Sequence, residues 1–299
     1  MTNHTYPPLV SIGMPAFNCA RTLSDAIHSI LLQTFTDWEL LILDDGSTDE
    51  TVSIARTFSD PRIRIFTHRD NQGLPKRLNE CIGLARGRYF ARMDADDISY
   101  SKRLELQLAY LQAHPEVDLV GGSISIFFGA GRLQGWRPAK LSHASICGPV
   151  TSRMSLAHVT WCGRRDWFAA NPYDIRRTLA QDRDLLLRSH RHSTFAAIPE
   201  VLVGVREERI SLTKQFHGRQ QLISTLLTDG FHNSDLSSIA AAACELAKFG
   251  LDLSAILTGL RYRILRHRAR VVDANLAKEW VDTWNQAHVR AFRRILTSA

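Results

Sequence analysis

Residues 88–99, RYFARMDADDIS, carry the strongest signal in this sequence for both the fold and a functional site. Positions 88–93 are rich in aromatic and apolar side chains and predict a buried strand. Three carboxylates then occupy four positions, at Asp94, Asp96 and Asp97. Two like charges about 4 Å apart repel by roughly 1 kcal/mol even in water, so this turn predicts a positively charged partner.

The same succession of apolar strand and amphipathic helix repeats through the first 126 residues. Strands are predicted over 10–14, 38–43, 62–67, 88–93 and 117–128. Helices are predicted over 22–33, 47–58, 74–85 and 101–114. Thr22 with Asp25, and Ser47 with Glu50, have capping-box spacing at the starts of the first two helices. This alternation indicates an α/β sandwich with a mainly parallel sheet.

Polar turns follow three of the predicted strands, at 15–18 (PAFN), 44–47 (DDGS) and 94–97 (DADD). Ligands bind beyond the carboxyl ends of the strands in sheets of this kind. If the three strands are parallel neighbours, their turns meet at one edge of the sheet. We therefore expect five aspartates around one site.

These aspartates have the chemistry of a metal and nucleotide site. Asp94 and Asp96 are two positions apart, so on an extended segment both carboxylates face one ligand. Hard oxygen ligands of this kind suit Mg²⁺ or Mn²⁺, which complete their coordination with substrate phosphates. Asp44 and Asp45 can accept hydrogen bonds from a base or a ribose. The simpler alternatives are a polar turn at 44–47 and a helix cap at Asp97.

The rest of the chain gives weaker patterns. Residues 129–148 are expected to form a surface loop, 179–188 a short helix, and 195–205 an extended segment. From residue 212 onward the chain is predicted to be helical. An arginine-rich helix over 253–272 has two readings: its apolar stripe packs on the catalytic domain, or its basic face rests on an anionic membrane surface.

Composition restricts the class of protein. The 299 residues are 44% hydrophobic and 22% charged, which is enough for a sizeable core, and the net charge of +7 favours anionic partners. Five scattered cysteines, without C-x-x-C spacing, indicate reduced thiols and argue against a zinc site. The N-terminus lacks signal-peptide features, and the longest apolar runs are too short to span a bilayer. We expect a cytoplasmic protein, peripheral at the inner face of the membrane if the basic helix binds lipid.

Several stretches together resemble family 2 glycosyltransferases of the GT-A fold. They are VSIGMPAFN (10–18), SILLQTFTDWELLILDDGSTDET (29–51), NQGLPKRLNECIGLARGRYFARMDADDIS (71–99), HPEVDLVGG (114–122), QDRDLLLR (181–188) and IPEVLVGVR (198–206). The resemblance implies a GT-A nucleotide-sugar-binding and catalytic domain over 1–212, followed by a helical C-terminal extension over 213–299. Its sheet would be Rossmann-like, mixed and mainly parallel.

The resemblance also implies roles for individual residues. Asp96 would bind the divalent cation, Mn²⁺ or Mg²⁺, and Asp182 would be the general base. Asp45 would contact the nucleotide base, and Asp94 the ribose or diphosphate. The full set implied for nucleotide-sugar binding is Pro15, Phe17, Asn18, Asp44, Asp45, Asp94 and Ala95.

This sequence departs from the family pattern at a few positions. Gln181 stands where the family usually has Glu, and Leu78 stands where many relatives carry Arg. Asn171-Pro172-Tyr173 replaces a Gly-Gly-Tyr element before the 179–188 helix. His158 matches a His-Pro-Thr-like element near the acceptor side, where a structural role is an equal alternative.

The expected function is an inverting, metal-dependent glycosyltransferase that moves a sugar from a nucleoside diphosphate sugar to an acceptor hydroxyl. A UDP-sugar donor is favoured because UDP is the commonest nucleotide in the family. The acceptor would be a glycan or a lipid-linked sugar in cell-surface polysaccharide or glycolipid synthesis. The alternatives are a silent nucleotide-sugar-binding scaffold and a nucleotidyltransferase, which usually needs a glycine-rich phosphate loop. Nucleic-acid binding is not expected, because the basic residues are not interleaved with stacking aromatics.

Overall fold

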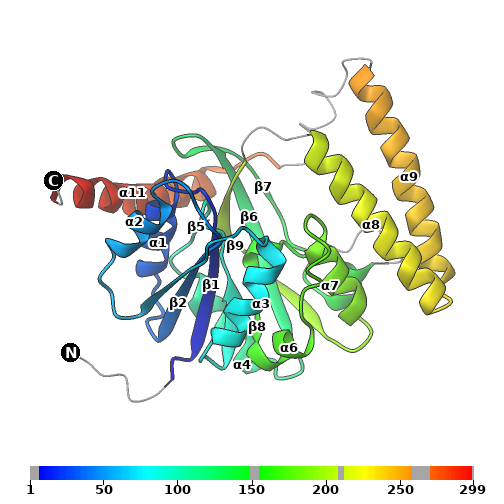
Figure 1. Ribbon diagram of the computed structural model, residues 1–299, viewed down its shortest axis with the longest axis horizontal. Coiled ribbons are helices and arrows are strands. Elements are labelled where there is room, and N and C mark those ends of the chain that lie inside the picture. The colour runs from blue at the N-terminus through cyan, green and yellow to red at the C-terminus, as the bar shows by residue number, and fades with distance from the viewer. Residues whose placement is uncertain (1–6, 149–154, 208–211, 258–269, 298–299) are drawn as a thin grey trace.

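A computed structural model describes residues 7–148, 155–207, 212–257 and 270–297 of the chain (Figure 1). Its strands are β1 Val10–Ala16, β2 Trp38–Asp44, β3 Ile63–Thr67, β4 Tyr89–Arg92, β5 Ile98–Ser99, β6 Leu119–Phe128, β7 Arg132–Arg137, β8 Cys162–Arg164 and β9 Phe195–Arg206. Its helices are α1 Leu23–Leu31, α2 Thr51–Arg56, α3 Leu74–Leu84, α4 Arg103–Ala113, α5 His143–Cys147, the 3-10 helix η1 His158–Thr160, α6 Arg165–Ala170, α7 Gln181–Ser189, α8 Leu212–His232, α9 Leu236–Leu257 and α11 Ala274–Thr297.

The described strands form one mixed sheet in the order β3-β2-β1-β4-β8-β6-β9-β5, with β7 paired to β6. The β3-β2-β1-β4 half is entirely parallel. Antiparallel pairs lie in the other half, where β8 runs against both β4 and β6. The turns after β1, β2 and β4 therefore lie side by side at one carboxyl edge, as the sequence predicts.

Apolar side chains cover both faces of the sheet, which explains the continuous apolar runs of the parallel strands. In β2, Leu40 and Ile42 enter one hydrophobic cluster, while Leu41 and Leu43 enter another on the opposite face. Helices α1, α2 and α4 cover the first cluster. Helices α3, α6, α7 and α8 cover the second. The result is the three-layer α/β sandwich expected from the sequence (Figure 1).

The C-terminal helices take part in these cores. Helices α8 and α9 pack on each other, and Leu222 and Leu226 of α8 join the cluster beside α7. Helix α11 returns to pack on α1, on the side of the molecule away from α8 and α9 (Figure 1). There Trp280 is buried against Phe127 of β6. The arginine-rich stretch predicted over 253–272 falls mostly outside the described residues.

The expected loop over 129–148 is wrong, because this segment contains β7 and α5. Strand β7 pairs antiparallel with the outer part of β6, across a turn with Gly129 and Gly131 at positive φ. The strand is half-exposed and is held to β6 by backbone hydrogen bonds. Its sequence therefore lacks the alternation of apolar and polar residues from which a strand is predicted. None of the helices in the described part of the chain is long and apolar enough to cross a bilayer.

The two predicted capping boxes are also wrong. Neither α1 nor α2 has a side-chain hydrogen bond at its N-cap. The hydroxyl of Thr22 instead donates to the carbonyl of Ala95 (3.0 Å), and the hydroxyl of Ser47 accepts from the amide of Asn18 (2.9 Å). These side chains tie neighbouring loops together at the carboxyl edge of the sheet.

Candidate active site

The loops after β1 and β2 are joined by several hydrogen bonds. The amide of Asp45 donates to the carbonyl of Ala16 (2.8 Å), and the side-chain oxygen of Asn18 accepts from the amide of Thr48 (2.9 Å). Asn18 has φ of 48°, a left-handed conformation that asparagine tolerates better than most residues. Phe17, in the same turn, is 47% exposed. Pro15, two residues before Phe17 and near the end of β1, is half-buried.

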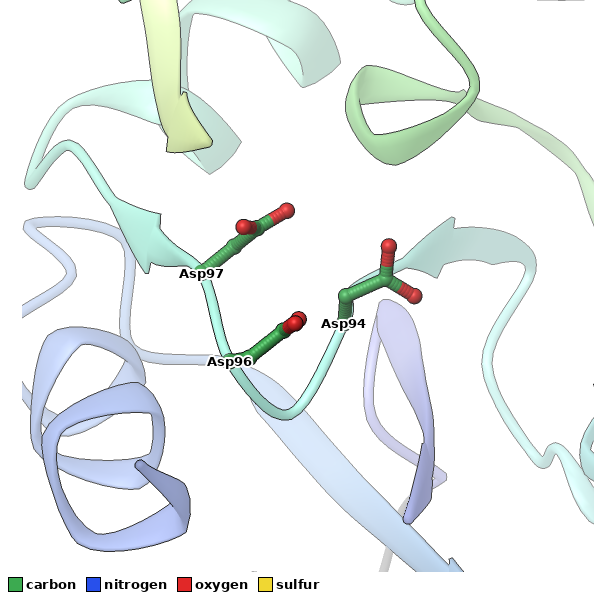
Figure 2. A group of neighbouring side chains, drawn as sticks. All are labelled: Asp94, Asp96 and Asp97. Carbon is green, nitrogen blue, oxygen red and sulfur yellow. The ribbon is translucent and has the colours of Figure 1, made fainter. Parts of the chain in front are cut away.

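The turn after β4 brings three carboxylates together. One oxygen from each of Asp94, Asp96 and Asp97 lies within 4.8 Å of the others. Figure 2 shows their side chains projecting from one bend of the chain into a common space. Within the described ranges, this is the one group of three or more potential metal-ligating side chains.

Electrostatics at this turn are unfavourable without a cation. Partial burial among protein atoms, and next the charge of Asp94, raise the pKa of Asp96 to about 6. Burial and then the charges of Asp96 and Asp94 raise the pKa of Asp97 well above its usual range. A divalent cation would relieve this repulsion, and hard carboxylate oxygens on an accessible turn suit Mg²⁺ or Mn²⁺. The residues present therefore fit the cation that the sequence predicts.

The three carboxylates differ in the ion pairs and hydrogen bonds that they form with other protein groups. Asp94 forms an ion pair with the buried Arg92 at 2.5 Å. Asp97 is buried and accepts a hydrogen bond from the amide of Arg206 at 2.8 Å. Asp96 is the most exposed residue of the three, and no other described residue donates a hydrogen bond to its carboxylate. Asp96 is thus the carboxylate with most capacity for an incoming ligand.

Asp45 lies in a different environment from the three aspartates of the β4 turn. It is buried, and its carboxylate accepts from the amides of Gln72 (2.9 Å) and Gly73 (2.8 Å) and from Nε of Arg77 (2.6 Å). Asp44 is also buried, and its carboxylate accepts from the amide of Ser47. Of the five aspartates expected around one centre, the structure gathers three, while Asp44 and Asp45 organise the adjoining loops.

Arg77 is a residue of this region that no motif in the sequence indicated. Leu78, which stands where many relatives carry arginine, is fully buried in the core, and its neighbour Arg77 supplies a guanidinium to Asp45. A signal was available, because Leu74, Leu78 and Cys81 repeat at helical spacing and require position 78 to face the sheet. Arg92 and Arg206 were also missed, since each lies within an apolar strand pattern.

Asp182 lies in the first turn of α7, half-buried, and its carboxylate has no hydrogen-bond or ion-pair partner among the described residues. Its neighbour Asp184 is buried and bonded to Nε of Arg188 at 2.8 Å. Burial raises the pKa of the Tyr173 hydroxyl, and the charges of Asp182 and Asp94 contribute to that rise. Asp182 and Asp94 therefore both lie near enough to Tyr173 to influence its ionisation.

The half-buried His158 pairs with the buried Tyr173. Nε2 of His158 lies 2.9 Å from the Tyr173 hydroxyl, and the imidazole packs edge-on against Trp161. Burial, and then the charge of Arg92, hold the pKa of His158 well below its usual range, so the ring is neutral. Gln181 is also buried, and its side-chain oxygen has no partner among the described residues.

Comparison with solved structures defines the class of protein. S. aureus TarS, solved with UDP, aligns over 93% of this chain and 79% of its own, with a TM-score of 0.57 and 17% identity. The Pyrobaculum calidifontis mannosyltransferase PcManGT, solved with GDP-Man and Mn²⁺, aligns over 96% of this chain and 88% of its own, with a TM-score of 0.58 and 16% identity. At such identities the likeness establishes the fold, which is that of GT-A glycosyltransferases.

The sequence comparisons identify the family. The model for glycosyl transferase family 2 matches residues 11–170. EpsE of Bacillus subtilis is 42% identical over 123 residues, 40% of this chain and 44% of that protein. The Escherichia coli enzyme WfgD is a UDP-Glc:alpha-D-GlcNAc-diphosphoundecaprenol beta-1,3-glucosyltransferase. It is 41% identical over 103 residues, which are 34% of this chain and 41% of that protein. The chain belongs to glycosyltransferase family 2, and it spans less than half the length of these two relatives.

Proposed function

We propose that this glycosyltransferase moves a sugar from a nucleoside diphosphate sugar to an acceptor hydroxyl, with inversion and with Mn²⁺ or Mg²⁺ held at Asp96. The observation that carries the proposal is the cluster of Asp94, Asp96 and Asp97 at the carboxyl edge of the sheet. The carboxylate of Asp182, which has no partner among the described residues, supports it as a candidate base. The cation, when bound, supplies the positive charge that stabilises the departing diphosphate.

The donor would lie across the turns after β1, β2 and β4. A carboxylate has about four lone-pair positions, and Asp45 uses three of them, which leaves one for a base N–H. Phe17 and Pro15 would line the base, and Asp94 would contact the ribose or diphosphate. The other residues assigned to the donor are Asn18, Asp44 and Ala95. TarS with UDP and PcManGT with GDP-Man support this ligand class, and we favour a UDP-sugar.

Asp182 would accept the proton of the acceptor hydroxyl as that oxygen attacks the anomeric carbon. A bond forms between the acceptor oxygen and the anomeric carbon, while the bond to the diphosphate breaks and its electron pair leaves with the nucleotide. Attack from the face opposite the leaving group inverts the configuration. The engagement of Asp184 by Arg188 supports Asp182 as the base, because Asp182 is the carboxylate of α7 that stays free.

The acceptor is proposed to be a glycan or a lipid-linked sugar, in cell-surface polysaccharide or glycolipid synthesis. The name of WfgD includes a diphosphoundecaprenol-linked sugar, which supports this class. We propose that the enzyme is cytoplasmic, and peripheral at the inner face of the membrane if the basic helix binds lipid. All five cysteines are unpaired, which is typical of a reducing compartment.

We also propose that residues 1–212 form the catalytic domain and that 213–299 extend it as a covering layer. The hydrophobic clusters run across this boundary, since Leu226 of α8 and Trp280 of α11 are buried against catalytic-domain side chains. Such an extension is available for acceptor or membrane contacts.

Calorimetry of UDP binding with and without Mn²⁺ tests the metal assignment. Asp96→Ala should abolish the Mn²⁺-dependent part of the affinity while leaving the fold intact. Asp166→Ala, whose side chain is 86% exposed on α6, is the matched control and should behave as wild type. Unchanged Mn²⁺-dependent affinity in Asp96→Ala would remove Asp96 as the ligand. Slow Mn²⁺-dependent hydrolysis of nucleotide sugars would distinguish an active transferase from a silent scaffold.

A further inference from the structure

We propose that helix α11 positions the turn that carries Asp96, and that it acts through Arg206 and Trp284. The inference rests on the proposed role of Asp96 as metal ligand. Neither Arg206 nor α11 lies within residues 11–170, the region matched by the family model.

Arg206, the last residue of β9, holds the acidic turn by its backbone and by its side chain. Its amide donates to the carboxylate of Asp97 (2.8 Å), and its Nε donates to the backbone carbonyl of Asp96 (3.0 Å). In Figure 2 the yellow-green end of β9 lies beside Asp97. Because the guanidinium binds the carbonyl of Asp96, the carboxylate of that residue stays available. The charge of Arg206 also lowers the pKa of Asp96, against the stronger effect of burial.

The guanidinium of Arg206 is itself held in place from several directions. Its Nη1 donates to the carbonyl of Gly129 (2.7 Å), and its Nη2 lies 3.9 Å from the carboxylate of Asp25. Its central carbon lies 4.7 Å from the ring centre of Phe127 and 5.7 Å from that of Trp284. An arginine stacked on aromatic rings loses much of its freedom and gains attraction from the ring faces.

Trp284 comes from α11 and is fixed by its own neighbours. His288, one turn later, stacks on Trp284 with an interplanar angle of 16°, and its Nδ1 lies 3.1 Å from Asp25 of α1. Trp280, one turn earlier, donates from its indole nitrogen to the carbonyl of Gly131 (2.7 Å). A Cβ on Gly131 would lie 2.4 Å from the Trp284 ring, so glycine is required for this close approach.

These contacts form a continuous path from the C-terminal helix to the acidic turn. Trp284 lies against Arg206, and Arg206 bonds to Asp96 and Asp97. Three mutually repelling carboxylates need an external support to keep one geometry before a cation arrives, and pre-organisation of ligands raises affinity. Arg206 and Trp284 are therefore positioning residues, which do not themselves touch the substrate.

The test compares Trp284→Ala and Trp284→Phe by two measurements that do not require activity. Hydrogen–deuterium exchange of residues 94–98 in the metal-free protein reports the order of the turn, and electron paramagnetic resonance of Mn²⁺ reports its affinity, alone and with UDP. We expect Trp284→Ala to speed exchange and to weaken Mn²⁺ binding about tenfold, on the scale of a cation–π contact and its consequences. Trp284→Phe, which keeps an aromatic face, should recover most of both.

Trp167→Ala is the matched control, because Trp167 is a buried tryptophan of α6 on the other face of the sheet. It should lower the melting temperature without changing exchange at 94–98 or Mn²⁺ affinity. If Trp284→Ala does not fold, Arg206→Lys keeps the charge and removes the Nε bond, and it should also weaken Mn²⁺ binding and speed exchange.

Wild-type exchange and Mn²⁺ affinity in the folded variants, or equal changes in Trp167→Ala, would overturn the inference. If Asp96→Ala loses Mn²⁺ while Trp284→Ala and Arg206→Lys keep it, the positioning role fails and the metal site stands. If wild type and Asp96→Ala bind Mn²⁺ equally, the metal assignment fails and the inference falls with it.

Discussion

Asp182 and Asp184 are two positions apart in α7 and have opposite environments. Asp184 is buried, bonded to Arg188 at 2.8 Å, and lies 3.4 Å from the hydroxyl of Thr225 in α8. It connects α7 to the C-terminal helices. Asp182 is half-buried and unpaired among the described residues, and its charge contributes to the raised pKa of Tyr173. At the scale of single residues, an ion pair and a hydrogen bond occupy the carboxylate of Asp184, while the carboxylate of Asp182 has no partner among the described residues.

Asp182→Asn should reduce sugar transfer by about 10²–10⁴-fold, the usual contribution of a general base. The amide keeps the shape of the side chain and cannot accept the proton, so donor and Mn²⁺ affinity should stay near wild type. The measurement is turnover with a nucleotide sugar and acceptor, alongside calorimetry with UDP and Mn²⁺. Asp184→Asn is the contrasting variant and should lower thermal stability. Retained turnover in Asp182→Asn would exclude this residue as the base.

Asp96 gives a prediction for the pH dependence of stability. Its pKa is raised from 3.8 to about 6 in the metal-free protein, so between these values the folded state binds more protons than the unfolded state. Folding stability from this group is therefore greatest at low pH and falls as pH rises toward 6. Asp97 acts in the same direction.

The difference between wild type and Asp96→Asn in melting temperature, followed from pH 4 to 7 in chelator, isolates this effect. Wild type should lose stability relative to the variant as pH rises. Addition of Mn²⁺ should reverse the loss above about pH 6, because the cation requires deprotonated ligands. A constant difference across the range would contradict the raised pKa.

At the scale of elements, the start of α3 and the loop before it are built around one buried ion pair. Arg77 and Asp45 are both nearly inaccessible, and Asp45 also binds the backbone of Gln72 and Gly73. The β2 turn, the loop after β3 and the first turns of α3 thus share one carboxylate. These bonds fix the orientation of the Asp45 carboxylate before any ligand binds.

Arg77→Met should destabilise the protein by about 3–5 kcal/mol, because it leaves the Asp45 carboxylate buried without its cation. Urea unfolding measures this change. The double variant Asp45→Asn, Arg77→Met should recover part of the loss, since the uncompensated charge is removed. Equal destabilisation by the single and double variants would show that the ion pair is not the source of the cost.

At the scale of the whole molecule, the C-terminal helices are part of the hydrophobic clusters that cover the sheet. Leu222 and Leu226 of α8 are buried on one face of the sheet, and Trp280 of α11 on the other. Helix α11 lies close to α1 although some 250 residues separate them in sequence (Figure 1). The enzyme therefore depends on its last helices for the packing of its first.

A chain that ends at residue 212 should be markedly less stable than the full chain. It loses α8, α9 and α11, and each large apolar side chain removed from a core contributes about 2 kcal/mol. The melting temperature and binding of a dye to exposed apolar surface are the measurements. A shortened chain that melts cooperatively at the wild-type temperature would instead identify 213–299 as an independent appendage.

Much of the fold is predictable from the sequence because its signals are local. Apolar runs such as 38–43 and the helical spacing of 74–85 are confirmed as β2 and α3. Segments held by backbone pairing alone, such as β7, were not predictable, because a half-exposed edge strand needs no distinctive side chains. The capping boxes failed for a related reason: the hydroxyl of Thr22 satisfies a carbonyl 73 positions away instead of its own helix.

The sequence by itself determined most of the alternation of strands and helices up to β6, and it placed three acidic and polar turns at the ends of predicted strands. It did so because burial imposes a local period on apolar residues and parallel strands end at one edge. Only the tertiary structure decided which aspartates meet, which are bound by Arg77 or Arg206, and that Trp284 of the last helix supports the turn of Asp96. These contacts join residues far apart in the chain, and partners of that kind leave no periodic mark on the sequence.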